Sequence, residues 1–599
     1  MFPHEKPRQG QKELMEDVEQ AVENGKNLIA HAPTGLGKTA GVLTPALQYA
    51  LDNDKHVFFL TNRHSQHMMA IDTLKKMAQN GDFMAADLIG KKHMCSAAGI
   101  NELPHSDFSS YCAHVRKKRT CDFYTKTVDK NRELTSMAKK KIKEIDEPKE
   151  SEEIKKNFSR FCPYEITVEL MKRSKAVVCD YFHVFSSEET SILKKIDVGL
   201  EDCVVIVDEA HNLPTRLRSM MSQRLSTYIL SNAIDEAEEL EFWQLENDLK
   251  EIYSEFKELR DDVEDECFFP KKGLVRKIER ICDYDELIDR LEEGVDRVLE
   301  EKKRSFLDSI ASFLKEWRGE DEGFARILRS GDKGYLSLDY VCLDPSLISS
   351  NVIANAHSTI LMSGTMKPME MYEDLLGMEE SRTMSREYES DFPEENRKVV
   401  VYPEVTSKYS QRDSDQYRKI ADTVEDCVQE IPGNSIVFFP SYSFLHNVEL
   451  KMDRNVIVEN SDWDKEERNQ VIDRFRDSDR NTLFGVMGGS FYEGIDLPGD
   501  ALNGVIIVGV PLANPDLEIK STINYYKEKF DEGWNYAYLY PALIKVTQSC
   551  GRLIRSKGDR GVAVLMDNRY LRSKYKDFFS AWNLTATEEP EQEIKDFFS

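Results

Sequence analysis

One short segment limits the fold more than any other. Residues 32–39, with the sequence APTGLGKT, follow an apolar run at 27–30 and precede a helix-like stretch. A glycine-rich loop between a strand and a helix is typical of parallel α/β sheets, which gather ligands at the carboxyl ends of their strands. Similar β-branched runs recur at 57–60, 176–179, 204–207 and 359–362, and again at 399–401, 435–439, 504–508 and 562–565. We therefore expect two open α/β sheets.

The chemistry of this loop suits a nucleoside triphosphate. Gly35 and Gly37 let backbone amides approach phosphate oxygens. Lys38 would reach the β- and γ-phosphates, and Thr39 would hold Mg²⁺. The sequence thus predicts a site for ATP and Mg²⁺.

A second motif, Asp208-Glu209-Ala210-His211, ends the run at 204–207. There Asp208 would coordinate Mg²⁺, and Glu209 would position and deprotonate an attacking water. Near the C-terminus, Gln548, Arg552 and Arg555 are spaced i, i+4 and i+7, so that on a helix they would share one face. Such a stripe would bind a γ-phosphate from across a cleft.

Composition narrows the class of protein. The net charge of −27 argues against a protein that coats nucleic acid nonspecifically, although a channel needs only local positive charge. That charge is uneven: residues 91–180 hold 20 Lys/Arg against 14 Asp/Glu, whereas residues 231–270 hold 3 against 15. No apolar run has the length of a membrane span, and the first residues have no secretory signal, so we expect a cytoplasmic protein with reduced thiols.

The motifs together resemble those of DEAH-type superfamily 2 helicases. Ser363-Gly364-Thr365 matches the S-[AG]-T element that couples hydrolysis to lobe motion in that family. Gly494-Ile495-Asp496 matches part of E-G-I-D, and residues 548–555 match Q-x-x-G-R-x-[IL]-R. The resemblance implies that Asp496 and Arg552 join the ATP site.

Four cysteines, Cys95, Cys112, Cys121 and Cys162, lie in the basic region. None of their spacings is the C-x₂-C of a zinc knuckle, and the spacing alone leaves an iron–sulfur cluster, zinc and free thiols open. A four-cysteine insertion before the DEAH box is, however, similar to that of the XPD branch of helicases, which includes DinG-like proteins.

This resemblance implies a particular domain plan. Two RecA-like P-loop motor domains would be accompanied by a small Fe–S cluster domain at 86–167 and a helical Arch domain at 215–345, both inserted in the first. Helicase domain 1 would take residues 1–85, 168–214 and 346–370, and helicase domain 2 residues 371–599. The four cysteines would hold a 4Fe–4S cluster.

The resemblance also implies an ATP-dependent DNA helicase that moves 5′→3′ on single-stranded DNA, unwinds forks and serves excision repair, most like the single-chain archaeal members. We expect a monomer, with a repair-protein partner at the acidic Arch. Candidate nucleic-acid contacts are Arg63, Tyr164, Lys172, Arg173 and Tyr181, with core packing the alternative for each aromatic ring. The motifs leave open a DinG-type translocase that does not serve excision repair, a scaffold with residual ATPase activity, and RNA as the track.

Overall fold

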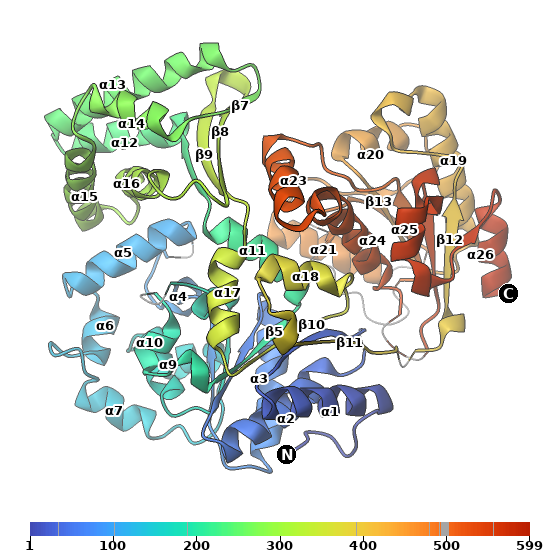
Figure 1. Ribbon diagram of the computed structural model, residues 1–599, viewed down its shortest axis with the longest axis horizontal. Helices are drawn as coiled ribbons and strands as arrows, with labels where there is room; N and C mark the ends of the chain where they lie inside the picture. The colour runs from blue at the N-terminus through green and yellow to red at the C-terminus, as the bar shows by residue number, and fades with distance from the viewer. Residues whose placement is uncertain are drawn as a thin grey trace.

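The computed structural model describes residues 1–599 except 34, 101, 188–189, 391, 478–479, 490, 493–501, 555 and 557. Two parallel sheets form two lobes, and two insertions extend from the first lobe (Figure 1). Every β-branched run named above forms a strand in one of these two sheets. The expected α/β class is therefore confirmed.

The first lobe is built on a seven-stranded parallel sheet. In spatial order its strands are β11 (Thr383–Glu387), β1 (Asn27–His31), β10 (Ser358–Ser363), β5 (Cys203–Asp208), β2 (His56–Leu60), β4 (Ala176–Cys179) and β3 (Ala85–Leu88). One face is covered by α1 (Gln9–Glu23), α2 (Lys38–Asp52) and α3 (His64–Ala78), and the other by helices that include α17 (Ser346–Asn355) and α18 (Met369–Leu376). Because β11 pairs with β1, the first sheet continues to Glu387, beyond the expected boundary at residue 370.

The second lobe repeats this plan with seven parallel strands. Their spatial order is β14 (Ile457–Val458), β15 (Thr482–Val486), β13 (Ser435–Phe439), β16 (Gly504–Val508), β17 (Gly561–Met566), β12 (Arg397–Tyr402) and β18 (Thr585–Ala586). The helices are α19 (Ser414–Glu430), α20 (Tyr442–Glu449), α21 (Lys465–Arg476), α23 (Leu517–Phe530), α24 (Tyr540–Cys550), α25 (Ser573–Phe578) and α26 (Pro590–Phe598). Apolar side chains fill both faces of this sheet.

The first insertion, which we call the cluster domain, consists of short helices. These are α4 (Lys91–Met94), α5 (His105–Lys117), α6 (Asp122–Thr127), α7 (Ser136–Ile142), α8 (Ser151–Asn157) and α9 (Pro163–Met171). Buried residues of α7, α8 and α9 belong to the same apolar cluster as the first sheet. A small domain with a modest core of its own thus gains stability from the lobe that carries it.

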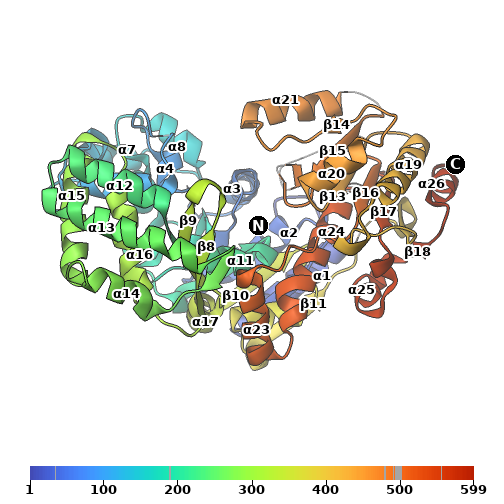
Figure 2. The same ribbon diagram turned by 90° about the horizontal axis from the view of Figure 1, so that it is seen from above.

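The second insertion, the Arch, combines helices with a sheet that the sequence analysis did not anticipate. Its helices are α12 (Thr227–Glu239), α13 (Trp243–Glu258), α14 (Lys271–Glu279), α15 (Tyr284–Glu301) and α16 (Phe306–Trp317). Its four-stranded antiparallel sheet has the order β6 (Gln223–Ser226), β9 (Leu336–Cys342), β8 (Phe324–Ser330) and β7 (Glu266–Phe268). The Arch lies above the cluster domain and reaches toward the second lobe (Figures 1 and 2). No helix among the described residues is long and apolar enough to cross a membrane.

Candidate ATP site and cluster domain

The phosphate-binding loop lies where the sequence predicted, between β1 and α2. Helix α2 begins at Lys38, and Gly37 before it has a left-handed φ of 82°. Gly35 has a φ of 87°, a region that side chains other than glycine rarely adopt. The Lys38 ammonium group is held 3.1 Å from the carbonyl oxygen of Ala32. The loop therefore presents a helix N-terminus and a positioned lysine to a phosphate group.

Helix α1 supports this loop from the other side. The Gln11 amide donates to the carbonyl oxygen of Gly37 at 2.8 Å, and the Arg8 guanidinium donates to that of Gly35. A Cβ on Gly37 would come within 2.6 Å of the Gln11 amide nitrogen, so the close approach requires glycine. These contacts give a physical role to an R-x-x-Q pair that carries little information as a sequence pattern.

The DEAH residues form a tight turn at the end of β5. Glu209 adopts a left-handed conformation, with φ 48° and ψ 43°, which is uncommon for a residue with a side chain and occurs mostly where the fold imposes it. The Tyr181 hydroxyl donates to the carbonyl oxygens of both Asp208 and Glu209 and holds this turn from behind. This turn places the two carboxyl groups at the carboxyl end of the central strand β5, within electrostatic range of Lys38 in the phosphate-binding loop.

The two acidic side chains have different electrostatic environments. Burial and the adjacent Glu209 raise the pKa of Asp208 to about 7, against the opposing effect of Lys38. Burial also acts to raise the pKa of Glu209, but His211, Lys38 and a hydrogen bond from Ser363 together hold it below its ordinary value. Glu209 is therefore maintained as a carboxylate that can accept a proton. Asp208 is a buried acid that a divalent cation would stabilise in its charged form.

A chain of hydrogen bonds links Glu209 to the second lobe. The Ser363 hydroxyl donates to the Glu209 carboxylate at 3.1 Å, and the backbone N–H of Thr365 donates to the Ser363 hydroxyl oxygen at 3.2 Å. Across the cleft, the Gln548 amide donates to the Thr365 hydroxyl at 3.4 Å. In the second lobe, the Tyr492 hydroxyl in turn donates to the Gln548 carbonyl oxygen. The S-G-T element thus lies between the DEAH turn and the opposite lobe.

The residues of the second-lobe motif do not lie on the one helix face that the sequence predicted. Helix α24 ends at Cys550 with Gly551 as its C-cap, so Arg552 lies in the turn that follows. The prediction that Gln548 and Arg552 share one helical stripe is wrong, because the helix stops between them. The Arg552 guanidinium donates to the carbonyl oxygens of Phe491 and Tyr492 within its own lobe. The remaining members of these motifs, Asp496 and Arg555, lie outside the described residues.

The four predicted cysteines come together in the cluster domain, and all are partly buried. Burial raises the pKa of Cys112, and the nearby Cys95 and Cys121 add to this effect, whereas Lys91 and Arg116 oppose it. Burial likewise raises the pKa of Cys162, with further contributions from Cys112 and Cys121. Each of the four thiols therefore lies within electrostatic range of at least two of the others or is linked to them through Cys112 and Cys121, although they are far apart in sequence.

The arrangement of the cysteines indicates which kind of metal centre they suit. Among the described residues, no three His, Cys, Asp or Glu side chains are placed to hold a single ion. In a four-iron cluster each thiolate binds a different iron atom, so the sulfur atoms stand further apart than around one ion. Cys121 and Cys162 are the N-cap residues of two helices, α6 and α9. The convergent thiols and the adjacent cations fit an anionic cluster better than they fit zinc.

The candidate nucleic-acid residues occupy several environments. Arg63 and Lys172 are exposed, and Lys172 pairs with Glu169 at 2.8 Å. The Arg173 guanidinium instead donates to two backbone carbonyls of the cluster domain, at 3.0 and 2.9 Å. Tyr164 and Tyr181 are 5% and 3% exposed, which favours the packing role that the sequence had left as an alternative.

Sequence reasoning missed a cluster of cations around the Tyr164 ring. Lys91 and Lys195 lie 4.7 and 5.5 Å from the ring centroid, and the Lys195 ammonium group donates to the Tyr164 hydroxyl. Arg116 nearby pairs with Glu165 at 3.0 Å. Because these residues come from three separate segments, only the tertiary structure brings them together. No spacing pattern could have revealed them.

Three sequence families match parts of this chain. They are described as Helicase C-terminal domain, over residues 424–585, DEAD_2, over residues 59–230, and DEAD/DEAH box helicase, over residues 8–102. A probable ATP-dependent helicase from Methanocaldococcus jannaschii is 24% identical, with 95% of this chain and 92% of the relative covered. The ATP-dependent DNA helicase XPD of Sulfolobus acidocaldarius is also 24% identical, with 94% and 96% covered.

Solved structures agree on the fold. A structure described as XPD helicase superposes with a TM-score of 0.72 at 21% identity and covers 98% of this chain and 100% of its own. The structure of Xpd4 from S. tokodaii has a TM-score of 0.61 at 16% identity, with 97% and 100% covered. The fold of these structures thus matches this chain over nearly its whole length. The chain is therefore similar to XPD helicases over nearly its whole length, and parts of it match the DEAD_2 and helicase C-terminal families.

Proposed function

We propose that this protein is an ATP-dependent DNA helicase that translocates 5′→3′ on single-stranded DNA, unwinds duplexes and serves DNA repair. Relatives that cover most of the chain are named as ATP-dependent DNA helicases, and one from Saccharomyces cerevisiae is named as a general transcription and DNA repair factor subunit. The 5′→3′ direction of movement and the role in repair are carried over to this chain from the helicases that it resembles.

The observation that carries the proposal is the hydrogen-bonded path from Glu209 through Ser363 and Thr365 to Gln548. A residue suited to activate water is thereby linked to the opposite lobe. A change at the γ-phosphate would alter the contact between Thr365 and Gln548. Conversely, a change in the position of the second lobe would alter the position of Glu209. Such reciprocal coupling is what a motor requires.

Each side chain of the ATP site has a role in this proposal. Lys38 and the loop amides would bind the phosphates, while Thr39 and Asp208 would hold Mg²⁺, which would screen the developing negative charge. Glu209 accepts a proton from the attacking water. Arg552, now bonded within its own lobe, would turn to the γ-phosphate when the lobes close.

The cluster domain would hold a 4Fe–4S cluster through Cys95, Cys112, Cys121 and Cys162, with the cluster acting as a covalent staple for a small fold. The cations around Tyr164 lie beside these thiols and offer a positively charged surface to a DNA backbone. Phe182, which is 44% exposed, is a better candidate for stacking on a base than the buried Tyr181.

The test compares wild-type protein, purified without oxygen, with Glu209→Gln. We expect ATP hydrolysis that rises with single-stranded DNA, displacement of a strand from a duplex with a 5′ overhang, and about four iron atoms per chain. The Glu209→Gln variant should bind ATP and DNA without either activity. DNA-stimulated hydrolysis without strand displacement would identify a translocase, and preference for a 3′ overhang would reverse the proposed polarity. If RNA but not DNA stimulates ATP hydrolysis, the protein moves on RNA and not on DNA.

A further inference from the structure

Arg329 of β8 is one of the residues through which the Arch contacts the second lobe. Its guanidinium lies 3.1 Å from the carboxylate of Asp516 and 3.2 Å from that of Glu518, which begin helix α23 of the second lobe. Within the Arch, the same side chain pairs with Asp339 at 3.0 Å and Glu266 at 3.7 Å. One half-buried cation therefore joins two acids of the Arch to two acids of a different lobe.

Other contacts strengthen this joint. The Glu266 carboxylate accepts a hydrogen bond of 2.6 Å from the backbone N–H of Leu517, at the first residue of α23. Leu517 and Tyr525 also pack against the apolar face of the Arch sheet. The Tyr525 hydroxyl donates at 2.7 Å to Asp344, a carboxylate that follows β9. Charged and apolar contacts thus hold α23 along one edge of the Arch.

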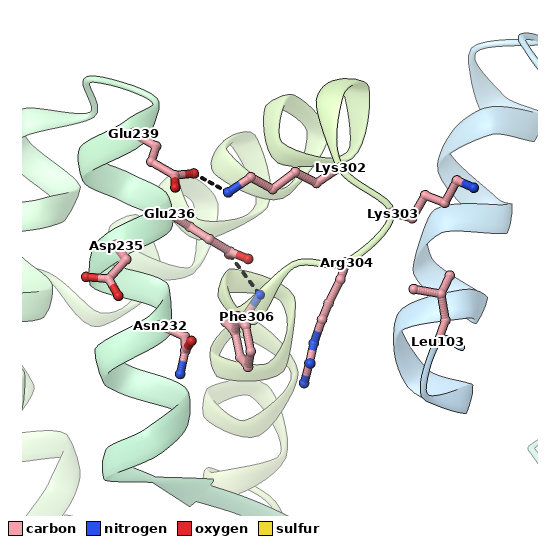
Figure 3. A pocket seen from close by; sticks show the side chains of 9 residues that line it. All are labelled: Leu103, Asn232, Asp235, Glu236, Glu239, Lys302, Lys303, Arg304 and Phe306. Atoms are coloured by element: carbon pink, nitrogen blue, oxygen red, sulfur yellow. Dashed lines mark hydrogen bonds and ion pairs between the residues drawn. The ribbon is translucent and has the colours of Figure 1, made fainter. Parts of the chain in front are cut away.

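On its other side, the Arch meets the cluster domain more loosely. The contacts are polar. Arg304 pairs with Asp107 at 2.7 Å and Lys118 with Glu300 at 2.9 Å, and the Asp296 carboxylate lies 3.1 Å from His114 and 3.3 Å from Lys117. In addition, the Ser110 hydroxyl donates to Asp308 at 2.6 Å and the Lys303 ammonium group to the carbonyl oxygen of Ala98 at 2.7 Å. At least one partner of each ion pair is exposed. A cavity of about 320 Å³ lies beside these pairs, lined mostly by the Arch, and Figure 3 shows Leu103 of the cluster domain and Lys303 of the Arch bordering it. Ion pairs that water reaches contribute little stability, whereas the joint to α23 combines a half-buried network with apolar packing.

We infer that Arg329 and the start of α23 form a mechanical joint through which the Arch follows the second lobe. The inference depends on the proposed motor function. When ATP changes the position of the second lobe, the stronger joint at α23 should persist and the weaker contacts with the cluster domain should yield. Nucleotide binding would thereby change the gap between Arch and cluster domain. Arg329 is in this view a positioning residue that touches neither nucleotide nor DNA.

The joint can be weakened from the side of α23 without removing a helix cap. Asp516 is the N-cap of α23, and asparagine caps as well as aspartate, so Asp516→Asn with Glu518→Gln removes two charges and keeps the cap. Arg329→Gln removes the charge on the Arch side and so weakens the joint from there. Glu528→Gln, at an exposed position on the same helix, is the matched control for a lost charge.

The experiment measures energy transfer between dyes carried by unnatural amino acids at Asp289 in the Arch and Lys140 in the cluster domain, both exposed. In wild-type protein and Glu528→Gln, a non-hydrolysable ATP analogue with single-stranded DNA should change the transfer efficiency. In the Asp516→Asn/Glu518→Gln variant and in Arg329→Gln this change should disappear. DNA-stimulated ATPase activity should stay near the wild-type rate, which also demonstrates folding, while base pairs opened per ATP fall about fivefold.

Two results would overturn the inference while leaving the motor proposal intact. One is an unchanged transfer response in both joint variants, and the other is a wild-type protein whose ATPase is stimulated by DNA without any change in transfer. Wild-type protein that lacks DNA-stimulated ATPase activity would refute the proposed function, and the inference with it, before any variant is made.

Discussion

His67 gives the sharpest prediction about stability. This buried histidine of α3 places Nδ1 2.7 Å from the Asp87 carboxylate and Nε2 3.5 Å from that of Asp180. Asp87 also accepts a hydrogen bond of 2.9 Å from the backbone N–H of Ser151 in the cluster domain. The imidazolium thus contacts one carboxylate on β3 and one that follows β4, in a network that reaches the insertion.

Burial alone would lower the pKa of His67, but Asp180 and Asp87 outweigh it and raise the pKa from 6.5 to about 9. Because the folded pKa exceeds the unfolded value, the stabilisation is fully present below pH 6.5 and is lost as the pH rises through 9. Each pKa unit corresponds to about 1.4 kcal/mol, so the contribution is on the order of 3 kcal/mol at low pH and about half of that at pH 8.

The perturbation is His67→Gln, which keeps a hydrogen-bond donor and removes the charge. Unfolding of the first lobe by denaturant, followed from pH 6 to pH 10, should show the variant less stable than wild type at pH 6, with the difference vanishing above pH 9. His64→Gln, at an exposed position on the same helix, controls for the loss of an imidazole. The reasoning fails if the difference is independent of pH, or if nuclear magnetic resonance shows that His67 titrates near 6.5.

Three further predictions concern the site. Glu209→Gln should lower the rate of ATP hydrolysis about 100-fold or more with little change in nucleotide affinity, and a variant that retains half of the activity would exclude Glu209 as the general base. Gln548→Ala, which removes the contact with Thr365, should reduce the stimulation of ATPase by DNA about tenfold while basal hydrolysis persists, as measured by steady-state kinetics. Cys121→Ser should abolish visible absorption and lower the iron content, whereas Cys282→Ser in the Arch should retain both; equal iron in the two variants would disprove the proposed ligand set.

Local sequence was enough to predict the parts of the site that lie next to one another along the chain. The phosphate-binding loop and the DEAH turn each follow a buried strand, and β-branched runs are strong predictors of such strands. The predicted stripe from Gln548 to Arg552 is wrong because the helix ends at Gly551. Glycine is a common signal for a helix end, but the prediction followed the i, i+4 spacing instead. The antiparallel sheet of the Arch was missed. Its β8–β9 hairpin follows directly on a long helical stretch, and its outer strands β6 and β7 are short and lie far from the hairpin in the sequence.

The sequence by itself thus determined the α/β class, the order of the motifs and the four cysteines that share the first insertion, since these depend on patterns along the chain. Only the tertiary structure decided what those residues contact. It placed Thr365 against Gln548 of the other lobe, gathered cations around Tyr164 and tied Arg329 to the start of α23. Such contacts join residues far apart in the chain, and their distances follow from how sheets and insertions pack, which no local pattern encodes.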